Sequence, residues 1–117
     1  MRTSDRKVNK ILKRQIENTF NQLIVDIKDT NEAQQILESI MTEKEYETLT
    51  KRLAIGYWLK KGRSYQNVKD NLKVSSATIA NVQSLSKTKG FEAALKKVEA
   101  EEWANLWASR IKKIVNK

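Results

Sequence analysis

Apolar residues recur three and four positions apart along the first quarter of the chain, which is the spacing of one helix face. This apolar stripe consists of Val8, Ile11, Leu12, Ile16, Phe20, Leu23, Ile24 and Ile27. It predicts a long amphipathic helix over about residues 4–28. The run Asp29-Thr30-Asn31 follows, and such side chains compete for backbone hydrogen bonds and favour helix caps. A break is therefore expected there.

A short second helix is expected next, with apolar positions at Ile36, Leu37, Ile40 and Met41. The sequence indicates four further helices after it. Thr42 with Glu45 has the spacing of a capping box, and Gly62 suits the end of that third helix. Its apolar positions are Tyr46, Leu49, Leu53, Tyr57 and Trp58. Ser64 and Ser75 are cap candidates for helices that reach about Leu72 and Lys87.

Gly90 is expected to separate the fifth helix from a last one over about residues 91–115. The apolar stripe of this last helix is Phe91, Ala94, Leu95, Val98, Trp103, Leu106, Trp107, Ile111 and Ile114. The chain shows no alternating strand pattern of useful length. The pattern therefore predicts an all-α protein of six helices, in one domain over residues 1–117.

Residues 64–87 have the pattern of a helix-turn-helix, in which two short helices and an apolar turn residue bury one set of side chains. The inward positions are Val68, Leu72, Val74, Ile79 and Val82. Lys69 and Lys73 stand where such units often carry a small residue and a glycine, and lysine stems can lie along apolar surface there. The competing interpretation is an ordinary helical hairpin in a bundle.

The chain has 117 residues, a formal charge of +9 and no Cys, His or Pro. This composition excludes disulfides, thiolate nucleophiles, zinc sites built from Cys or His, and triads that need a histidine base. We expect neither an enzyme nor a metal site. No apolar run approaches the roughly 20 residues of a spanning helix, and no apolar leader follows Met1. The expected location is the cytoplasm, with no membrane partner.

The positive charge is concentrated in residues 60–89, which hold seven basic residues and one acid, Asp70. Such a cluster favours a polyanionic partner, and nucleic acid leads, although a solvated surface is the simpler alternative. The second helix of the unit would enter the major groove, with Ser75, Ser76, Ala77, Ala80, Asn81 and Ser84 toward the bases. On the first helix, Gln66 and Lys69 could reach phosphate or a base edge. The flanking cations suit phosphate contacts, and they are Lys60, Lys61, Arg63, Lys73, Lys87 and Lys89.

The span from Met41 to Lys87 resembles the Trp repressor superfamily. The matching pieces are Thr42-Glu43, Leu49-Thr50-Lys51-Arg52, Gly62, Ser64 and Ala77-Thr78-Ile79. The resemblance implies an intertwined homodimer that binds palindromic operators in double-stranded DNA. The long apolar first helix would then meet a second copy of the chain.

The resemblance also implies a possible effector pocket for L-tryptophan, formed by Thr42, Arg52, Asn81 and Val82. Asn81 replaces an arginine that stacks on the indole, and Val82 replaces a glycine. An asparagine offers no cation to an aromatic ring, and an inward Val82 would fill the space of a ligand. We therefore expect no cofactor, and we disfavour tryptophan. A different small effector, or none, is expected instead. Alternatively, Arg52 is a helix-surface residue paired with Glu45 or Glu47.

The leading hypothesis is a dimeric, sequence-specific DNA-binding regulator of transcription, with repression implied by the resemblance alone. One alternative is a DNA-binding module of another process, such as recognition of a replication origin. Another is a helical protein–protein adaptor with Trp58, Trp103 and Trp107 as interface anchors. These tryptophans lie on apolar stripes, which favours a place in the core.

Overall fold

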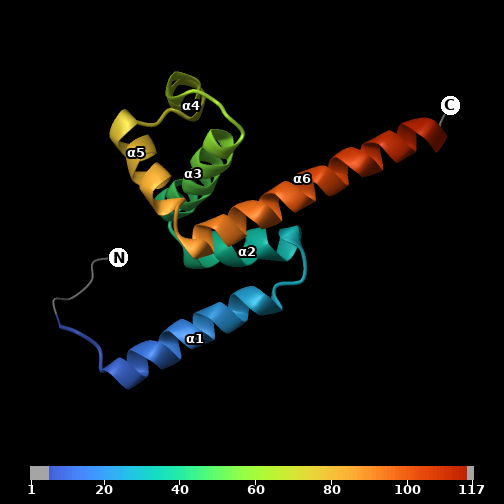
Figure 1. Cartoon of the computed structure of the whole chain (residues 1–117). Helices are drawn as coiled ribbons and strands as arrows, with labels where there is room; N and C mark the ends of the chain where they lie inside the picture. Colours follow the sequence, from blue (N-terminus) through green and yellow to red (C-terminus); the bar gives the residue numbers. More distant parts are fainter. Residues whose placement is uncertain (1–5, 116–117) are drawn as a thin grey trace. The chain divides into compact units, whose positions relative to one another are not determined.

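The computed structural model describes residues 6–115, without the side chains of Trp103 and residues 106–115. This range contains six α-helices and no strand: α1 (Lys10–Asp26), α2 (Thr30–Ile40), α3 (Glu43–Lys60), α4 (Tyr65–Leu72), α5 (Ser76–Leu85) and α6 (Lys89–Val115) (Figure 1). The all-α prediction is confirmed. None of the helices in the described range has the length and apolar character needed to cross a membrane.

The helices fall into two compact units, an N-terminal unit of residues Met1–Glu43 and a C-terminal unit of residues Lys44–Lys117. The N-terminal unit contains α1 and α2. The C-terminal unit contains α3, apart from its first residue, and the helices α4, α5 and α6. All residues predicted to face DNA belong to the C-terminal unit.

Helix α1 begins six residues later than the sequence pattern predicted. The side-chain oxygen of Asn9 accepts hydrogen bonds from the backbone N–H groups of Ile11 (2.8 Å) and Leu12 (3.4 Å). This N-cap fixes the start of the helix at Lys10, so Val8 precedes the helix. The predicted positions 4 and 5 lie outside the described residues. At the other end, Ile27 is extended, which ends α1 at Asp26 rather than at residue 28.

The apolar side chains of the N-terminal unit are largely exposed. Neither α1 nor α2 contains a buried residue. Ile11 is 72% exposed, Phe20 47% and Val25 75%. Helix α2 begins where the break was predicted, because the Asp29 carboxylate accepts from the Glu32 N–H at 2.8 Å. Its apolar face is covered in part, with Ile36 and Leu37 half-buried.

Helix α3 ends at a glycine, as predicted. Gly62 has φ +87°, the left-handed conformation that a glycine adopts most readily. The Arg63 N–H donates to the Trp58 carbonyl (3.1 Å) and the Gly62 N–H to the Leu59 carbonyl (3.0 Å). This pair of bonds is a Schellman motif, which satisfies the last carbonyls of the helix. It turns the chain directly into Ser64 and α4.

The core of the C-terminal unit is built around the predicted inward face of the helix-turn-helix. Ile55, Val68, Ile79 and Val82 are buried, with exposed fractions of 0%, 0%, 0% and 2%. Partly buried side chains packed against them are Trp58, Leu59, Leu72, Val74 and Phe91. All five predicted inward positions are therefore confirmed, together with a core position for Trp58. Sequence analysis did not single out Ile55, which anchors this core from α3.

Helix α6 begins at Lys89, so the prediction that Gly90 separates it from α5 is wrong. Thr88 caps the helix instead, since its hydroxyl accepts from the Phe91 N–H at 3.3 Å. Phe91 then packs on α3 against Gly56: a Cβ placed on Gly56 would lie 2.5 Å from a ring carbon of Phe91. Leu95 is buried one turn later, with 4% exposed. The predicted positions Trp103, Leu106, Trp107, Ile111 and Ile114 lie outside the described side chains.

Candidate nucleic-acid interface

Helices α4 and α5 pack against each other and are joined by a tight turn. Both predicted caps are present: the Ser64 hydroxyl accepts from the Asn67 N–H, and the Ser75 hydroxyl from the Thr78 N–H, each at 3.1 Å. Lys73, where helix-turn-helix units often carry glycine, adopts a left-handed conformation with φ 56° and ψ 53°. This unusual backbone places Val74 toward the core and Ser75 at the start of α5.

The outward face of α5 is the face that the sequence predicted. Ser75, Ser76, Ala77, Ala80, Asn81 and Ser84 are all exposed. Ile79 and Val82, on the inward face, are buried. The hydroxyl of Ser75 serves the cap and lies 2.9 Å from that of Thr78, so these two side chains act as a pair. Helix α5 ends at Leu85, two residues before the predicted Lys87, because residues 86–88 form a turn.

Positively charged residues stand in the segments before and after this uncharged helix. Exposed side chains are found at Lys60, Lys61, Arg63, Lys69, Lys73, Lys87 and Lys89. Asp70, the one acid within residues 60–89, accepts a hydrogen bond from the Gln66 amide at 2.8 Å. Gln66, predicted to meet phosphate or a base edge, is thus held on the surface of α4. Lys60 forms an ion pair with Glu99 at 3.0 Å, which directs it toward α6.

Arg63 is held in place at the start of α4. Its guanidinium carbon lies 4.0 Å from the centroid of the Trp58 ring, and one of its N–H groups donates to the Asn67 side chain at 3.3 Å. Stacking on an aromatic ring and a second hydrogen bond restrict an arginine that would otherwise be mobile. The sequence predicts Arg63 as a phosphate contact, but it gives no sign that Trp58 and Asn67 position the guanidinium.

A cavity of about 320 Å³ lies between α3 and the start of α5, and we call it the α3–α5 cavity. Its lining consists of Lys44, Glu47, Thr48, Lys51, Arg52, Ile55, Lys73, Val74, Ser75, Thr78, Asn81 and Val82. Three of the four predicted pocket residues, Arg52, Asn81 and Val82, are therefore brought together. The fourth, Thr42, belongs to the N-terminal unit and is not part of this lining.

The sequence did not reveal the other charged members of the α3–α5 cavity. Glu47 pairs with Lys51 at 3.0 Å, and this hydrogen bond lowers the pKa of the Glu47 carboxyl. The predicted alternative paired Arg52 with Glu45 or Glu47, and the observed partner of Glu47 is Lys51. The sequence does indicate that positions 44, 48, 51, 52 and 55 lie together on one side of α3, because they have the spacing of one helix face. Thr78 was also missed, although it belongs to the Ala77-Thr78-Ile79 run.

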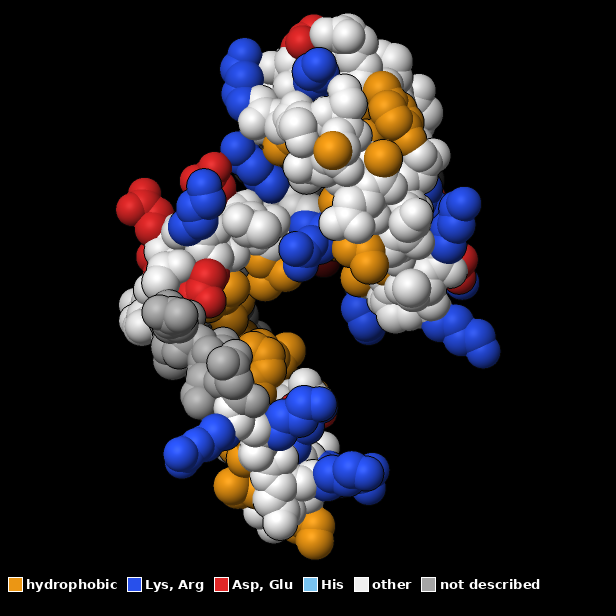
Figure 2. Space-filling model, turned by 90° about the vertical axis from the view of Figure 1, so that its left-hand side faces the viewer, with side chains coloured by type: hydrophobic (Ala, Val, Ile, Leu, Met, Phe, Trp, Pro, Cys, Tyr) orange, Lys and Arg blue, Asp and Glu red, His pale blue; other side chains and the backbone are white. Residues whose placement is uncertain are grey.

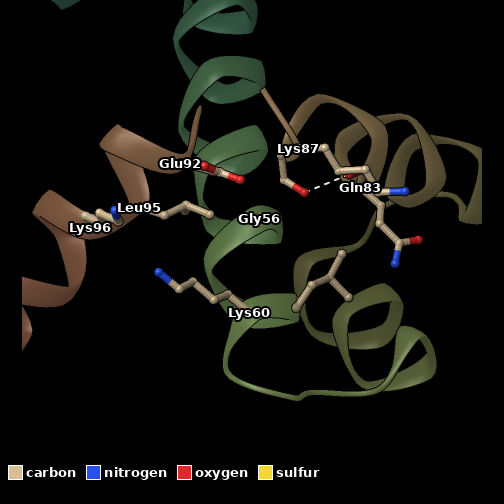
Figure 3. Close-up of a pocket in the computed structure, with 9 residues that line it drawn as sticks. Gly56, Lys60, Gln83, Lys87, Glu92, Leu95 and Lys96 are labelled. Atoms are coloured by element: carbon tan, nitrogen blue, oxygen red, sulfur yellow. Dashed lines mark hydrogen bonds between the residues drawn. The ribbon is translucent and has the colours of Figure 1, made fainter. Parts of the chain in front are cut away.

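A second cavity, of about 410 Å³, lies where α3, the end of α5 and α6 meet. Figure 3 shows Gly56 on α3 facing this space, with Glu92, Leu95 and Lys96 on α6 and Lys60 on the next turn of α3. Gln83, Ser86 and Lys87 border it from the α5 side. Lys60 and Lys87 are the two predicted phosphate contacts in this lining. The lining holds three lysines, Lys60, Lys87 and Lys96, and one acid, Glu92, so it carries a net positive charge of two.

Comparison with known proteins places the chain in a family. The family model described as "Trp repressor protein" matches residues 15–99, from α1 into α6. The chain is also 26% identical over 98 residues to "Uncharacterized protein YerC" of Bacillus subtilis (strain 168), covering 82% of this chain and 93% of that protein. No solved structure matches the chain significantly. The chain belongs to the Trp repressor family of helical DNA-binding regulators.

Proposed function

We propose that this protein is a homodimeric transcriptional repressor that binds specific sequences in double-stranded DNA through α4 and α5. The observation that carries the proposal is the exposed, uncharged face of α5. The inward side chains of this helix, Ile79 and Val82, are buried in the core, and the neighbouring segments carry exposed lysines. A helix of this kind fits the major groove, while the surrounding cations fit the phosphates.

The chemistry of α5 determines how such a protein would read DNA. Ser76 and Asn81 offer a hydroxyl and an amide to base edges, and Ala77 and Ala80 offer methyl groups to thymine. Helix α5 has no lysine or arginine, so it lacks the bidentate contact that most often reads guanine. Affinity then rests mainly on the phosphate contacts of Lys69 and Lys73, and it depends strongly on salt.

The N-terminal unit supports the dimeric part of the proposal. Figure 2 shows apolar side chains on the surface of α1, in the lower part of the view, and those at Ile11, Ile16 and Phe20 are about half exposed or more. Exposed apolar patches of this kind mark interaction surfaces. A second copy of the chain would cover the patch, and its two-fold symmetry would present two reader helices to two half-sites.

The test compares two classes of substitution on specific and random DNA. Replacing Lys69 and Lys73 together with Ala is expected to weaken binding to every sequence and to reduce the slope of log affinity against log salt by about 1 per lost contact. Replacing Asn81 with Ala is expected to change the preference between sequences, by about 1–3 kcal/mol at the contacted base pair. Lys97→Ala, at an exposed lysine of α6, is the control for the loss of one positive charge away from α4 and α5.

Two results would contradict this assignment. Equal effects of the Lys69/Lys73 and Asn81 variants on specific and random DNA would show that α5 is not the reading helix. Absence of any salt-dependent DNA binding by the wild-type protein would favour a protein–protein adaptor instead.

We also propose that DNA binding is independent of L-tryptophan. Val82 is buried in the core beside the α3–α5 cavity, and Asn81 cannot stack a cation on an indole. Operator affinity should not change on addition of millimolar tryptophan. A tenfold rise in affinity, equivalent to about 1.4 kcal/mol, would contradict this part of the proposal.

A further inference from the structure

We propose that Trp58 and Asn67 hold the Arg63 guanidinium in position to bind one phosphate of the DNA backbone. Arg63 is the residue that would contact the phosphate, and Trp58 and Asn67 are positioning residues that act through it. The inference rests on the proposed function, because it takes α4 and α5 as the helices that approach DNA. It adds which cation is fixed before DNA binds and which residues fix it.

Two helices restrain the side chain of Arg63. Its guanidinium carbon lies 4.0 Å from the centroid of the Trp58 ring on α3, and one of its N–H groups donates to the Asn67 side chain on α4 at 3.3 Å. The backbone N–H of Arg63 also donates to the Trp58 carbonyl, at 3.1 Å. The main chain and the side chain of Arg63 are therefore both attached to Trp58.

Trp58 can support an arginine because the tryptophan is itself packed on the core. Its side chain is half-buried and contacts the buried cluster of Ile55, Val68, Ile79 and Val82. Arg63, in contrast, is exposed. The guanidinium thus lies against a ring that the core holds still, while the rest of the group remains open to solvent.

Neither partner of Arg63 neutralises its charge. An indole ring and an amide are uncharged, and within the described residues no carboxylate lies at ion-pair distance from Arg63. The lysines Lys51 and Lys60 differ, because each is paired with a glutamate at 3.0 Å. An ion pair satisfies a cation, whereas stacking on an aromatic ring leaves its net charge for a further anion.

Arg63 also keeps the hydrogen-bond donors that a phosphate requires. Asn67 accepts from one N–H group of the guanidinium, and the remaining N–H groups lie in the same plane. A pair of parallel N–H groups matches two oxygens of one phosphate. A lysine offers a point charge on a flexible stem instead, so its position is fixed only when the contact forms.

The place of Arg63 in the fold suits a backbone contact. Asn67, its partner, is exposed on the first turn of α4, and the buried Val68 marks the opposite, inward side of that helix. The first helix of a helix-turn-helix crosses the DNA backbone. Arg63 precedes α4 and Lys73 follows it, so the two cations could contact phosphates at both ends of the helix and fix its orientation on the duplex.

The first experiment uses the full-length protein without DNA. The side-chain N–H signals of Arg63 are recorded by NMR, because the ring current of a stacked indole displaces them from the usual arginine position. Displaced signals are expected in wild type, a smaller displacement in Trp58→Phe and none in Trp58→Leu. Trp58→Phe keeps the measurement informative should Trp58→Leu fail to fold. Signals at the usual position in wild type would overturn the proposal.

The second experiment measures operator affinity in a double-mutant cycle. Arg63→Lys keeps the charge but loses the planar fork, so affinity should fall about fivefold or more. Asn67→Ala should lower affinity about twofold to threefold in the wild-type background and have no effect in the Arg63→Lys background, because Asn67 acts through Arg63. Arg14→Lys, the same change at an exposed arginine of α1, is the matched control and should bind like wild type.

The third experiment identifies the group that Arg63 contacts. Neutral methylphosphonates are placed one at a time along the operator backbone. At one position the substitution should weaken wild type by about threefold or more and leave Arg63→Gln unchanged, since the variant has no cation to lose its partner.

Several outcomes overturn the inference while the proposed function stands. They are wild-type affinity in Arg63→Lys, an equal effect of Asn67→Ala in both backgrounds, and no methylphosphonate position that separates wild type from Arg63→Gln. A loss in Arg63→Lys that depends on the base at one operator position would also overturn it, because Arg63 would then read a base. If wild type binds no DNA at all, the proposed function fails with the inference, and a displaced NMR signal would mark a purely structural stack.

Discussion

The two units of the chain use the same helical spacing of apolar residues but differ in what covers those residues. In the C-terminal unit, Ile55, Val68 and Ile79 are completely buried. In the N-terminal unit, α1 has no buried residue, and Ile11 and Val25 are each more than 70% exposed. One unit therefore completes its own core, whereas the other presents an apolar face to its surroundings.

This difference shows what helical periodicity specifies. The spacing identifies the face of a helix that is apolar, but it carries no information on the element that covers the face. For α4 and α5 the cover is local, because a tight turn brings the two faces together. For α1 the proposed cover is a second copy of the chain, since buried apolar surface contributes about 25 cal/mol per Å².

The largest expected effect comes from placing a charge on the apolar face of α1. Phe20→Asp should convert the dimer to a monomer at micromolar concentration, because an unpaired carboxylate cannot be buried at an apolar interface without a large cost. Asn18→Asp, an exposed polar position of the same helix, is the matched control and should remain dimeric. Sedimentation equilibrium measures both. A wild-type protein that is folded and monomeric would remove the proposed reason for the exposed face.

The next effect tests how tightly the C-terminal unit is packed. Gly56→Ala places a Cβ at 2.5 and 2.8 Å from two carbons of the Phe91 ring, so the ring and the start of α6 must move. Overpacking of this kind typically costs about 1–3 kcal/mol of unfolding free energy.

Gly90→Ala is its control, because nothing lies within 4 Å of a Cβ built on Gly90 and the residue is in a helix. That variant should gain roughly 0.5–1 kcal/mol in chemical denaturation. Equal stability of the two variants would show that α6 does not pack on α3 through Phe91.

Local signals explain why the helix-turn-helix could be predicted. Ser64 and Ser75 cap their helices through bonds to residues three positions on, so sequence alone contains both partners. The inward positions, such as Val68 and Ile79, follow from two short periods joined by an apolar turn residue. Both caps and all five inward positions lie within residues 64–82, so the local pattern was sufficient to predict them.

The start of α1, the start of α6 and the full lining of the α3–α5 cavity could not be predicted from the sequence. Competing caps explain the two helix starts, and contacts between helices explain the cavity. Asn9 and Ser4 are both good N-caps, and the apolar stripe passes through Val8, so periodicity could not choose between them. Gly90 predicts a helix boundary, but the cap is provided by Thr88, two residues earlier. The α3–α5 cavity joins Arg52 to Asn81 across helices, and no single periodic pattern contains that juxtaposition.

A smaller effect is expected at the turn between α4 and α5. Lys73 holds a left-handed conformation, which is unfavourable for a residue with a Cβ and favourable for glycine. Lys73→Gly should raise the unfolding free energy by a few tenths to about 1 kcal/mol, after the greater flexibility of glycine in the unfolded state is counted.

Lys73→Ala is the control. It removes the same charge, but alanine has a Cβ and the left-handed conformation therefore remains unfavourable. Both variants should lose DNA affinity equally, while chemical denaturation should find only Lys73→Gly more stable than wild type. Greater stability of both would trace the effect to relief of charge repulsion rather than to the backbone.

The smallest effect concerns the exposed ion pair between α3 and α6. A hydrogen bond from Lys60 lowers the pKa of the Glu99 carboxyl below its ordinary value of 4.5. A carboxyl whose pKa is lower in the folded state adds stability above its unfolded pKa and loses it as the pH falls through the folded value. The melting temperature of wild type should therefore be slightly higher than that of Glu99→Gln at neutral pH. This difference in melting temperature should disappear as the pH falls below about 4.5. Both side chains are exposed, so added salt should shrink the difference as well.

Glu101→Gln, which alters an exposed carboxyl two residues along α6, is the control. A difference between wild type and Glu99→Gln that persists unchanged in acid would mean that Glu99 acts through packing of its side chain rather than through its charge.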